Sequence, residues 1–325
     1  MAAPALALVL PLILAAGCAL AQSNAAAPYP TKPVRLILGP APGGSGDIIT
    51  RIVASALSEH WGQQVVVDNR PGAGNTIATA IVARSVADGY TLLRCGVADV
   101  IAPALYKKLP YDFMRDIALI ARIGVTPNIM VIHTSVPAKT IPDFIALAKA
   151  NPGKLSYAAT GVGQSPQLSF ELFKSMAGID VLYVPYKSTG LATTDLLSGR
   201  VSAQINNLPS TLDNIRSGKV RALGVTSLKR NPKVPDVPTI AESGLAGFEV
   251  VSWTGMCAPS GVPGGIVKKI EADMQALLAT PALRHRLDEV GVDADPLNAD
   301  QFTALARTET VRWAKVIKDA GIPQQ

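Results

Sequence analysis

VRLILGPAPGGSGDIITRIVASALSEHWG, residues 34–62, is the stretch from which the rest of the chain can be understood. Its first five residues form a short β-branched and apolar run that predicts a buried strand. From Asp47 onward, apolar residues recur at helical spacing on one face, and Gly62 stands where a left-handed cap would end that helix. The stretch therefore predicts a strand, a glycine-rich loop and a helix, in that order.

The glycine-rich loop at residues 39–46 is a candidate anion-binding site. Glycines let backbone N–H groups approach a ligand closely, and a helix start adds free N–H groups and a partial positive charge. An unoccupied turn is the competing interpretation, since many α/β proteins contain one. Nucleotide motifs do not fit, because the loop lacks both a Gly-Lys-Ser/Thr ending and the third glycine of the dinucleotide fingerprint. The predicted ligand-binding residues here are Pro42, Gly43, Gly44, Ser45 and Asp47.

Further strand–loop–helix units follow along the chain. Their strands and helices are expected at residues 65–67 and 76–86, 155–158 and 166–177, and 181–184 and 191–197. Repeated units of this kind predict parallel sheets covered by helices, with ligands at the carboxyl ends of the strands. The loops at those ends add these predicted ligand-binding residues: Gly74, Asn75, Thr76, Thr160, Gly161, Gly163, Gln164, Ser165, Tyr186, Asn206 and Asn207.

The remaining segments predict how the chain divides into domains. A short helix is expected at 112–121, leading to a strand at 129–133. The last three helices, expected at 263–278, 281–290 and 300–320, have no sheet of their own and should pack on the first domain. The chain would then cross between domains twice, near 126–132 and 248–253, which predicts a hinge. The predicted organisation is a signal peptide at 1–21, one domain at 29–128 plus 250–325, and a second domain at 129–249.

The N-terminal segment has the features of a secretory leader. Residues 1–27 carry no charged side chain, and 6–16 are almost wholly apolar. Small residues precede Gln22, so a signal peptide cleaved after Ala21 is predicted, although the usual early Lys or Arg is missing. The alternatives are lipoprotein cleavage at Cys18 and retention as a short anchor. A secreted protein whose remainder is soluble is therefore expected.

The composition favours a small anionic ligand over a nucleic acid. The chain has 325 residues, 48% of them hydrophobic, which is enough for two ordinary domains. Its net charge of +6 and pI near 9.2 mildly favour anions. The basic residues are scattered without aromatic interleaving, so nucleic acid is not an expected partner. Cys95 and Cys257 are expected either to pair or to remain buried thiols.

The sequence contains no recognisable catalytic or cofactor-binding set. The three histidines lack metal-ligand spacing, and no nucleophile elbow is present. Asp47 as a general base and Tyr186 as a ligand contact are the remaining enzyme candidates. The competing interpretations are a carboxylate placed for the helix dipole and a packed tyrosine. Neutral backbone and hydroxyl donors are instead expected to hold a carboxylate without chemistry, which suits a carrier with no cofactor or metal.

Eight short motifs occur in order along the chain. They are Tyr29-Pro30-x-Lys32-Pro33, Pro42-Gly43-Gly44-x-x-Asp47, Asn69-Arg70-Pro71-Gly72-Ala73-Gly74, Asp88-Gly89-Tyr90-Thr91-Leu92-Leu93, Gly161-Val162-Gly163, Val184-Pro185-Tyr186-Lys187, Asn207-Leu208-Pro209-Ser210 and Pro235-Asp236-Val237-Pro238-Thr239. In them the chain resembles the Bug-type extracytoplasmic solute receptors of tripartite tricarboxylate transporters, over nearly everything after Tyr29. The resemblance implies an α/β, two-domain periplasmic-binding-protein fold, type II-like, with each domain a central sheet flanked by helices. It also implies closure on a small organic carboxylate and delivery to the membrane subunits of such a transporter.

The chain departs from the family pattern at positions that bear on the ligand. Residues 39–41 contain no aromatic side chain, and Gly46, Gln164 and Asn206 replace commoner residues. Asn206 stands where the family often has Asp, so a partner for a ligand's ammonium group is missing and amino acids are disfavoured. The alternatives to a transport receptor are a secreted enzyme on the same scaffold and a sensor for a membrane signalling protein. A monomer is expected.

Overall fold

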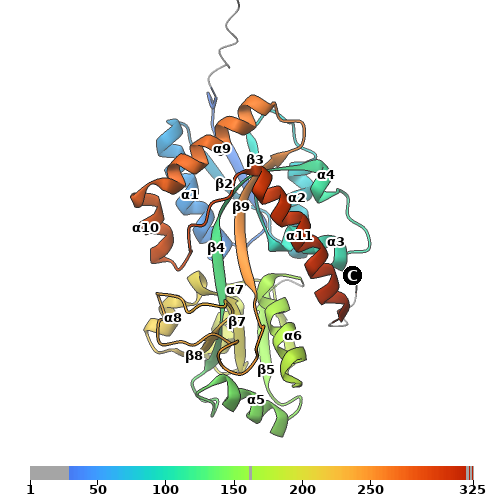
Figure 1. Ribbon diagram of the computed structural model, residues 1–325, viewed down its shortest axis with the longest axis vertical. Helices are drawn as coiled ribbons and strands as arrows, with labels where there is room; N and C mark the ends of the chain where they lie inside the picture. The colour runs from blue at the N-terminus through green and yellow to red at the C-terminus, as the bar shows by residue number, and fades with distance from the viewer. Residues whose placement is uncertain (1–28, 161–162, 320–321, 323, 325) are drawn as a thin grey trace, which may run out of the picture.

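The computed structural model describes residues 29–160, 163–319, 322 and 324, which form two lobes along one long axis (Figure 1). The first lobe combines the N-terminal strands with the C-terminal helices, and the second contains the middle of the chain. The predicted signal peptide lies outside the described residues. Among the described residues, no helix is both long and apolar enough to cross a membrane.

A mixed sheet forms the centre of the first lobe. Its strands, in spatial order, are β2 (Val65–Asn69), β1 (Val34–Leu38), β3 (Thr91–Gly96), β9 (Val251–Pro259) and β4 (Ile117–His133). The first three are parallel, as their strand–loop–helix connections require, and β9 is antiparallel to both β3 and β4. The helices of this lobe are α1 (Ser45–Trp61), α2 (Thr76–Ala83), α3 (Val97–Leu105), α4 (Phe113–Asp116), α9 (Gly264–Ala279), α10 (Pro281–Glu289) and α11 (Ala299–Asp319).

The second lobe repeats this arrangement on a smaller sheet. Its strands are β6 (Leu182–Tyr186), β5 (Ser156–Thr160), β7 (Ala203–Asn207) and β8 (Val220–Val225), together with the second half of β4. β5 is parallel to β6 and β7, whereas β4 is antiparallel to β7 and β8. The helices are α5 (Ile141–Ala150), α6 (Ser165–Ala177), α7 (Thr189–Leu197) and α8 (Leu212–Arg216). The α/β, two-lobed periplasmic-binding-protein fold predicted from the sequence is confirmed.

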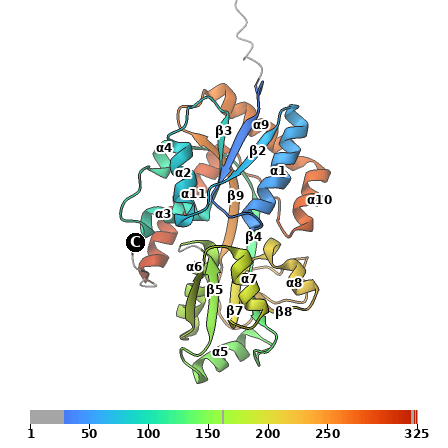
Figure 2. The ribbon, with the colours of Figure 1, turned by 180° about the vertical axis from the view of Figure 1, so that it is seen from behind.

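The long strands β4 and β9 run between the lobes (Figures 1 and 2). The helix expected at 112–121 is wrong beyond Asp116, where α4 ends after a single turn and β4 begins. The strand expected at 129–133 therefore starts at Ile117. Almost every residue from Ile117 to Gly124 is buried, which leaves no polar face for a surface helix. The expected parallel pairing holds for the strands of the repeated units, whereas the two connecting strands pair antiparallel, which makes the sheets mixed.

The predicted organising stretch folds as expected. Helix α1 starts at Ser45, two residues earlier than predicted, and ends at Gly62 in the left-handed conformation, with φ 61°. Ile49, Val53 and Leu57 are buried on one face of α1, in the same cluster as residues of α9. This packing fixes where the helix begins, and hence where its N-terminal N–H groups lie.

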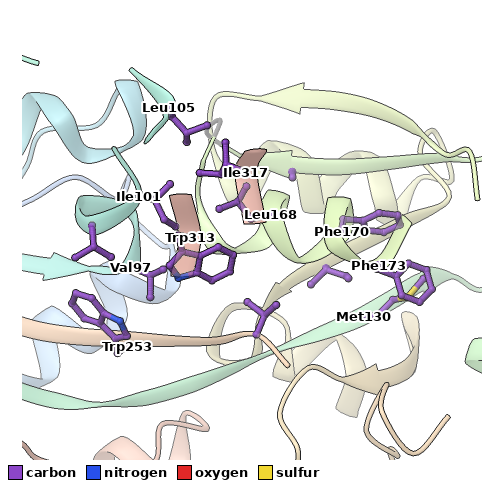
Figure 3. Close-up of a cluster of buried hydrophobic side chains, with 14 of the residues drawn as sticks. Val97, Ile101, Leu105, Met130, Leu168, Phe170, Phe173, Trp253, Trp313 and Ile317 are labelled. Atoms are coloured by element: carbon purple, nitrogen blue, oxygen red, sulfur yellow. The ribbon is translucent and has the colours of Figure 1, made fainter. Parts of the chain in front are cut away.

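A second apolar cluster continues from the first lobe into the second (Figure 3). Helix α11 packs on α3 and β4, as the sequence predicted for the C-terminal tail. Trp313 of α11 and Ile101 of α3 belong to the same cluster as Phe170 of α6. Trp253 of β9 packs edge-to-face on Phe302, with ring centroids 5.1 Å apart. The two lobes are therefore joined by packed side chains as well as by two strands.

Cys95 and Cys257 form a disulfide that ties β3 to β9, with their Cα atoms 6.3 Å apart. Both cysteines are fully buried. The sequence left pairing and free thiols as alternatives, and the structure has the pair. The bridge lies near the carboxyl end of β3, where Gly96 pairs with Thr254 of β9.

Candidate functional site

A cavity of about 430 Å³ lies between the lobes, at the carboxyl ends of several strands. Most of the sequence-predicted ligand-binding residues line it, namely Gly44, Ser45, Gly74, Asn75, Thr160, Gln164, Ser165, Tyr186, Asn206 and Asn207. Five predicted residues are described but do not line it, namely Pro42, Gly43, Asp47, Thr76 and Gly163. Gly161 lies outside the described residues. A ligand in this cavity would contact both lobes.

Asp47 supports the first loop from behind the cavity wall. Its carboxylate accepts hydrogen bonds from the Gly43 amide at 3.0 Å, from Arg51 Nε at 3.0 Å and from Asn69 Nδ2 at 2.9 Å. Burial raises the pKa of the Asp47 carboxyl, but these hydrogen bonds outweigh burial and hold the pKa below its usual value. A carboxylate held ionised in this way is a weak base, and the Gly43 amide is already bonded. Both residues shape the loop without facing the cavity.

Two long helices begin at the cavity wall without side-chain caps. The N-cap residues of α1 and α6, Gly44 and Gln164, make no capping hydrogen bond through their side chains. The first residues of both helices, Ser45 and Ser165, line the cavity. Free N–H groups and the partial positive charge of a helix start suit an anionic acceptor.

The first loop needs glycine at two positions for steric reasons. A Cβ on Gly39 would lie 2.1 Å from Asn75 Oδ1, and a Cβ on Gly46 would lie 2.6 Å from Pro40 Cγ. Glycine therefore allows this backbone to approach its neighbours and the cavity closely. The sequence predicted a tight loop but did not single out Gly39, which also lines the cavity.

Asn207 is held by a network that reaches both connecting strands. Its Nδ2 donates to Asn128 Oδ1 at 2.5 Å and to Ser252 Oγ at 2.9 Å. Asn128 Nδ2 in turn donates to the hydroxyls of Ser165 and Ser169, each at 2.7 Å. Asn128 lies on β4 and Ser252 on β9, so the network fixes the start of α6 relative to both strands. The sequence analysis missed these two supporting residues.

The side chain of Asn206 has one orientation that satisfies its surroundings. The Asn207 amide donates to Asn206 Oδ1 at 2.9 Å, which assigns oxygen to that position. The other amide atom, Nδ2, is buried and makes no hydrogen bond within the described residues. Asn206 lines the cavity, and its unpaired Nδ2 is a buried donor beside the cavity wall.

Arg94, at the end of β3, is a functional candidate that the sequence analysis missed. It lines the cavity, and its Nη2 donates to Thr254 Oγ1 at 2.6 Å. Burial lowers the pKa of Arg94 to about 10, against the opposing effect of Asp99, so the guanidinium is charged at neutral pH. The sequence analysis named only neutral donors, and Arg94 adds a charged group to the wall that those donors line. Its position near the carboxyl end of a strand was the available signal, since such residues meet at the ligand-binding edge.

The charged residues of the wall are all basic. Arg94 lies in the wall, and Lys187 is exposed beside it on the loop after β6. Among the described residues, no aspartate or glutamate lines the cavity. The nearest acidic partner of Arg94 is Asp99, which caps α3 by accepting from the Gly96 amide at 2.8 Å. An anionic ligand would therefore find complementary charge here, and a cationic ligand would not.

The remaining enzyme candidates are engaged in structural contacts. Tyr186 donates its hydroxyl to Asp195 Oδ2 at 2.7 Å. Burial and this acceptor raise the pKa of Tyr186. Within the described ranges, no group of three or more His, Cys, Asp or Glu side chains could hold a metal ion.

The sequence matches the family profile described as the tripartite tricarboxylate transporter family receptor, TctC, over residues 49–322. Protein BugT of Bordetella pertussis is 34% identical over 317 residues, which cover 95% of this chain and 97% of BugT. These matches extend over both lobes.

Solved structures agree with this match. R. palustris Rpa4515 with adipate superposes with a TM-score of 0.89 at 35% identity, covering 91% of this chain and 100% of that one. The structure of the periplasmic binding protein BugD superposes with a TM-score of 0.87 at 35% identity. It covers 91% of this chain and 100% of BugD. MatC from Rhodopseudomonas palustris with bound malate superposes with a TM-score of 0.82 at 30% identity. It covers 89% of this chain and 100% of MatC.

Proposed function

Because this chain belongs to the tripartite tricarboxylate transporter receptor family, we propose that it captures a small organic carboxylate between its lobes as a periplasmic solute-binding protein. The observation that carries the proposal is the chemistry of the cavity wall. That wall combines two uncapped helix starts, the Asn206 donor and Arg94, and contains no acidic side chain among the described residues. Such a wall binds anions and has no group placed to transform them.

The ligand class follows from the size and charge of the cavity together with the relatives. A volume of about 430 Å³ suits a small molecule. Similar proteins were solved with adipate and with malate, both of which are dicarboxylic acids. We therefore propose a small dicarboxylate or related organic acid as the ligand.

The biological setting is part of the same proposal. The chain would lose its leader after Ala21 and act in the periplasm as a monomer, passing its ligand to the membrane subunits of a tripartite tricarboxylate transporter. Its domains would divide at residues 128/129 and 249/250. Transport without turnover is favoured over an enzyme because Asp47 and Tyr186 are both engaged in structural hydrogen bonds.

A thermal-shift screen of carboxylates tests the proposal. The panel contains malate, succinate, adipate, citrate and benzoate, with aspartate and glutamate as ammonium-bearing counterparts. We expect at least one carboxylate without an ammonium group to raise Tm, and calorimetry to give its Kd. Incubation followed by NMR of the ligand should show no product. Absence of binding across the panel, or product formation, would contradict the proposal.

Two substitutions at one position test whether the first loop binds the ligand. Gly44 is the N-cap of α1, and both Asp and Asn are favoured there, so Gly44→Asp and Gly44→Asn should fold equally well. Only the aspartate places a negative charge at the proposed anion site. We expect Gly44→Asp to abolish carboxylate binding and Gly44→Asn to reduce it much less. Equal affinities for the two variants would exclude this loop from the site.

A further inference from the structure

Buried polar atoms without partners are concentrated at the cavity. Among the described residues, six buried side-chain nitrogen or oxygen atoms make no hydrogen bond, and four of them belong to cavity-lining residues. These four atoms are Asn75 Oδ1, Arg94 Nε, Asn206 Nδ2 and Trp253 Nε1. Three of the four are donors. Because an unpaired buried donor is costly, an acceptor that reaches these donors would stabilise the site.

Arg94 is the only one of these groups that carries a full charge. Its guanidinium lies between two glycines at helix starts: a Cβ on Gly46 would be 3.2 Å from Arg94 Cζ, and a Cβ on Gly96 would be 2.9 Å from Nη1. Both helix starts add partial positive charge beside the guanidinium. The Asp99 carboxyl offsets part of this positive charge, and an anionic ligand would offset more of it.

Within the part of the chain that the structure describes, no carboxylate forms a direct ion pair with Arg94. No carboxylate in the described part of the chain lies within 4.0 Å of the Arg94 nitrogens. The Asp99 carboxylate forms hydrogen bonds with other groups: it accepts from Thr79 Oγ1 at 2.6 Å and from the Gly96 amide at 2.8 Å. Thr254 accepts from Nη2 but carries no charge. Among the described residues, Arg94 is therefore a cavity-lining cation without a direct ion pair.

Resting on the proposed function, we infer that Arg94 is the residue that anchors the ligand's carboxylate and sets the charge selectivity of the cavity. A guanidinium gives charge-assisted hydrogen bonds of defined direction to a carboxylate, unlike the neutral amides of the loops. Asn206, on the other lobe, donates to a second oxygen acceptor of the ligand. The ligand that fits is an organic acid with at least one further oxygen acceptor and without an ammonium group.

Calorimetry on matched arginine variants tests this inference. Arg94→Gln and Arg94→Lys are compared with Arg35→Gln, which removes an arginine from the neighbouring strand β1, away from the cavity. Malate, succinate and adipate serve as probes, with aspartate as the ammonium-bearing counterpart of malate. For the tightest probe, Arg94→Gln should raise Kd roughly 10- to 100-fold, Arg94→Lys should raise it less, and Arg35→Gln should change it less than about threefold.

The outcomes separate this inference from the proposed function. Failure of the wild-type protein to bind any of the carboxylates would overturn the proposed function and the inference with it. Tight wild-type binding that Arg94→Gln retains would overturn the inference alone, as would aspartate binding as tightly as malate. A crystal structure of the wild-type complex keeps the test decisive if Arg94→Gln does not fold. A carboxylate oxygen within about 3 Å of an Arg94 nitrogen supports the inference, and a carboxylate held elsewhere overturns it.

Discussion

The orientation of one amide side chain bears directly on which ligands the cavity accepts. The Asn207 amide assigns oxygen to one end of Asn206, which leaves a donor at the other end. Asn206→Asp replaces that donor by a carboxylate oxygen that would repel an anion, whereas Asn206→Ala only removes it. We expect the Kd of the carboxylate found in the screen to rise roughly tenfold in Asn206→Ala and further in Asn206→Asp. Calorimetry checks this order, and unchanged affinity in Asn206→Asp would place Asn206 away from the ligand.

Asp47 should stabilise the fold in a pH-dependent manner. Hydrogen bonds hold its pKa below the unfolded value, so its contribution is present above the unfolded pKa and is lost as pH falls through the folded pKa. Asp47→Asn should therefore lower the free energy of unfolding by about 1–2 kcal/mol at pH 7. The difference from wild type should shrink towards pH 3, as urea denaturation at both pH values would show. A difference that stays constant or grows at low pH would contradict this assignment.

Single residues differ in how far the sequence could place them. Gly44 and Ser45 could be predicted, because a helix start after a glycine loop is a local pattern. Arg94 could not be assigned to the cavity, because its role depends on Thr254, which is 160 residues away. Gly163 was predicted as a ligand contact from its loop. Its backbone instead lies against α3, where an added Cβ would be 1.8 Å from Leu105 Cδ1.

The disulfide between β3 and β9 links the element that carries Arg94 to the element that carries Thr254. The two cysteines are 162 residues apart in the sequence, and Cys95 directly follows Arg94 on β3. The double variant Cys95→Ala/Cys257→Ala should lose roughly 2–5 kcal/mol of stability, chiefly because its unfolded state is less constrained. Thermal unfolding of the variant, and of the wild type with and without reductant, measures the loss. An identical Tm in all three samples would show that the bridge contributes nothing to stability.

Elements whose form follows from the spacing of their own residues were predicted well. Strand β4 was not, because its form depends on a strand far along the chain. Helices α1, α6 and α9 each have an apolar stripe and a recognisable start. Residues 117–124 carry apolar side chains on both faces, a pattern that does not by itself separate a short helix from a buried strand. The strand is selected by β9, which pairs with it along its length. Because β9 lies far along the chain, the local sequence does not contain that information.

The two lobes touch each other beside the cavity, so we expect binding and closure to be coupled through these contacts. The backbone of Gly163, in the second lobe, lies against Leu105 of α3 in the first lobe. In the same way, Gly291 of the first lobe lies against Leu208 of the second, and a Cβ added to Gly291 would be 2.9 Å from Leu208 Cδ2. Ligand-lining groups also come from both lobes, with Arg94 on one and Asn206 on the other. A ligand bridging these groups needs the lobes at this separation.

Closure can be tested by adding one methyl group where the lobes meet. Gly163→Ala should push the loop before α6 away from Leu105 and so weaken carboxylate binding, although Gly163 does not line the cavity. Gly178→Ala, at the other end of α6, is the matched control. Gly178 also has a positive φ, 61°, but an added Cβ there meets nothing within 4 Å. Both variants should lose about 1 kcal/mol of stability from backbone strain, and only Gly163→Ala should raise Kd.

A second substitution distinguishes steric blocking from local unfolding. Leu105→Ala removes the side chain that the new methyl group meets, so the double variant Gly163→Ala/Leu105→Ala should regain much of the lost affinity even though Leu105→Ala alone costs core packing. Small-angle scattering adds a direct measure of shape. Saturating ligand should reduce the radius of gyration of wild type and of the double variant more than that of Gly163→Ala. Equal contraction and equal Kd in all variants would mean that approach of these two surfaces is not needed for binding.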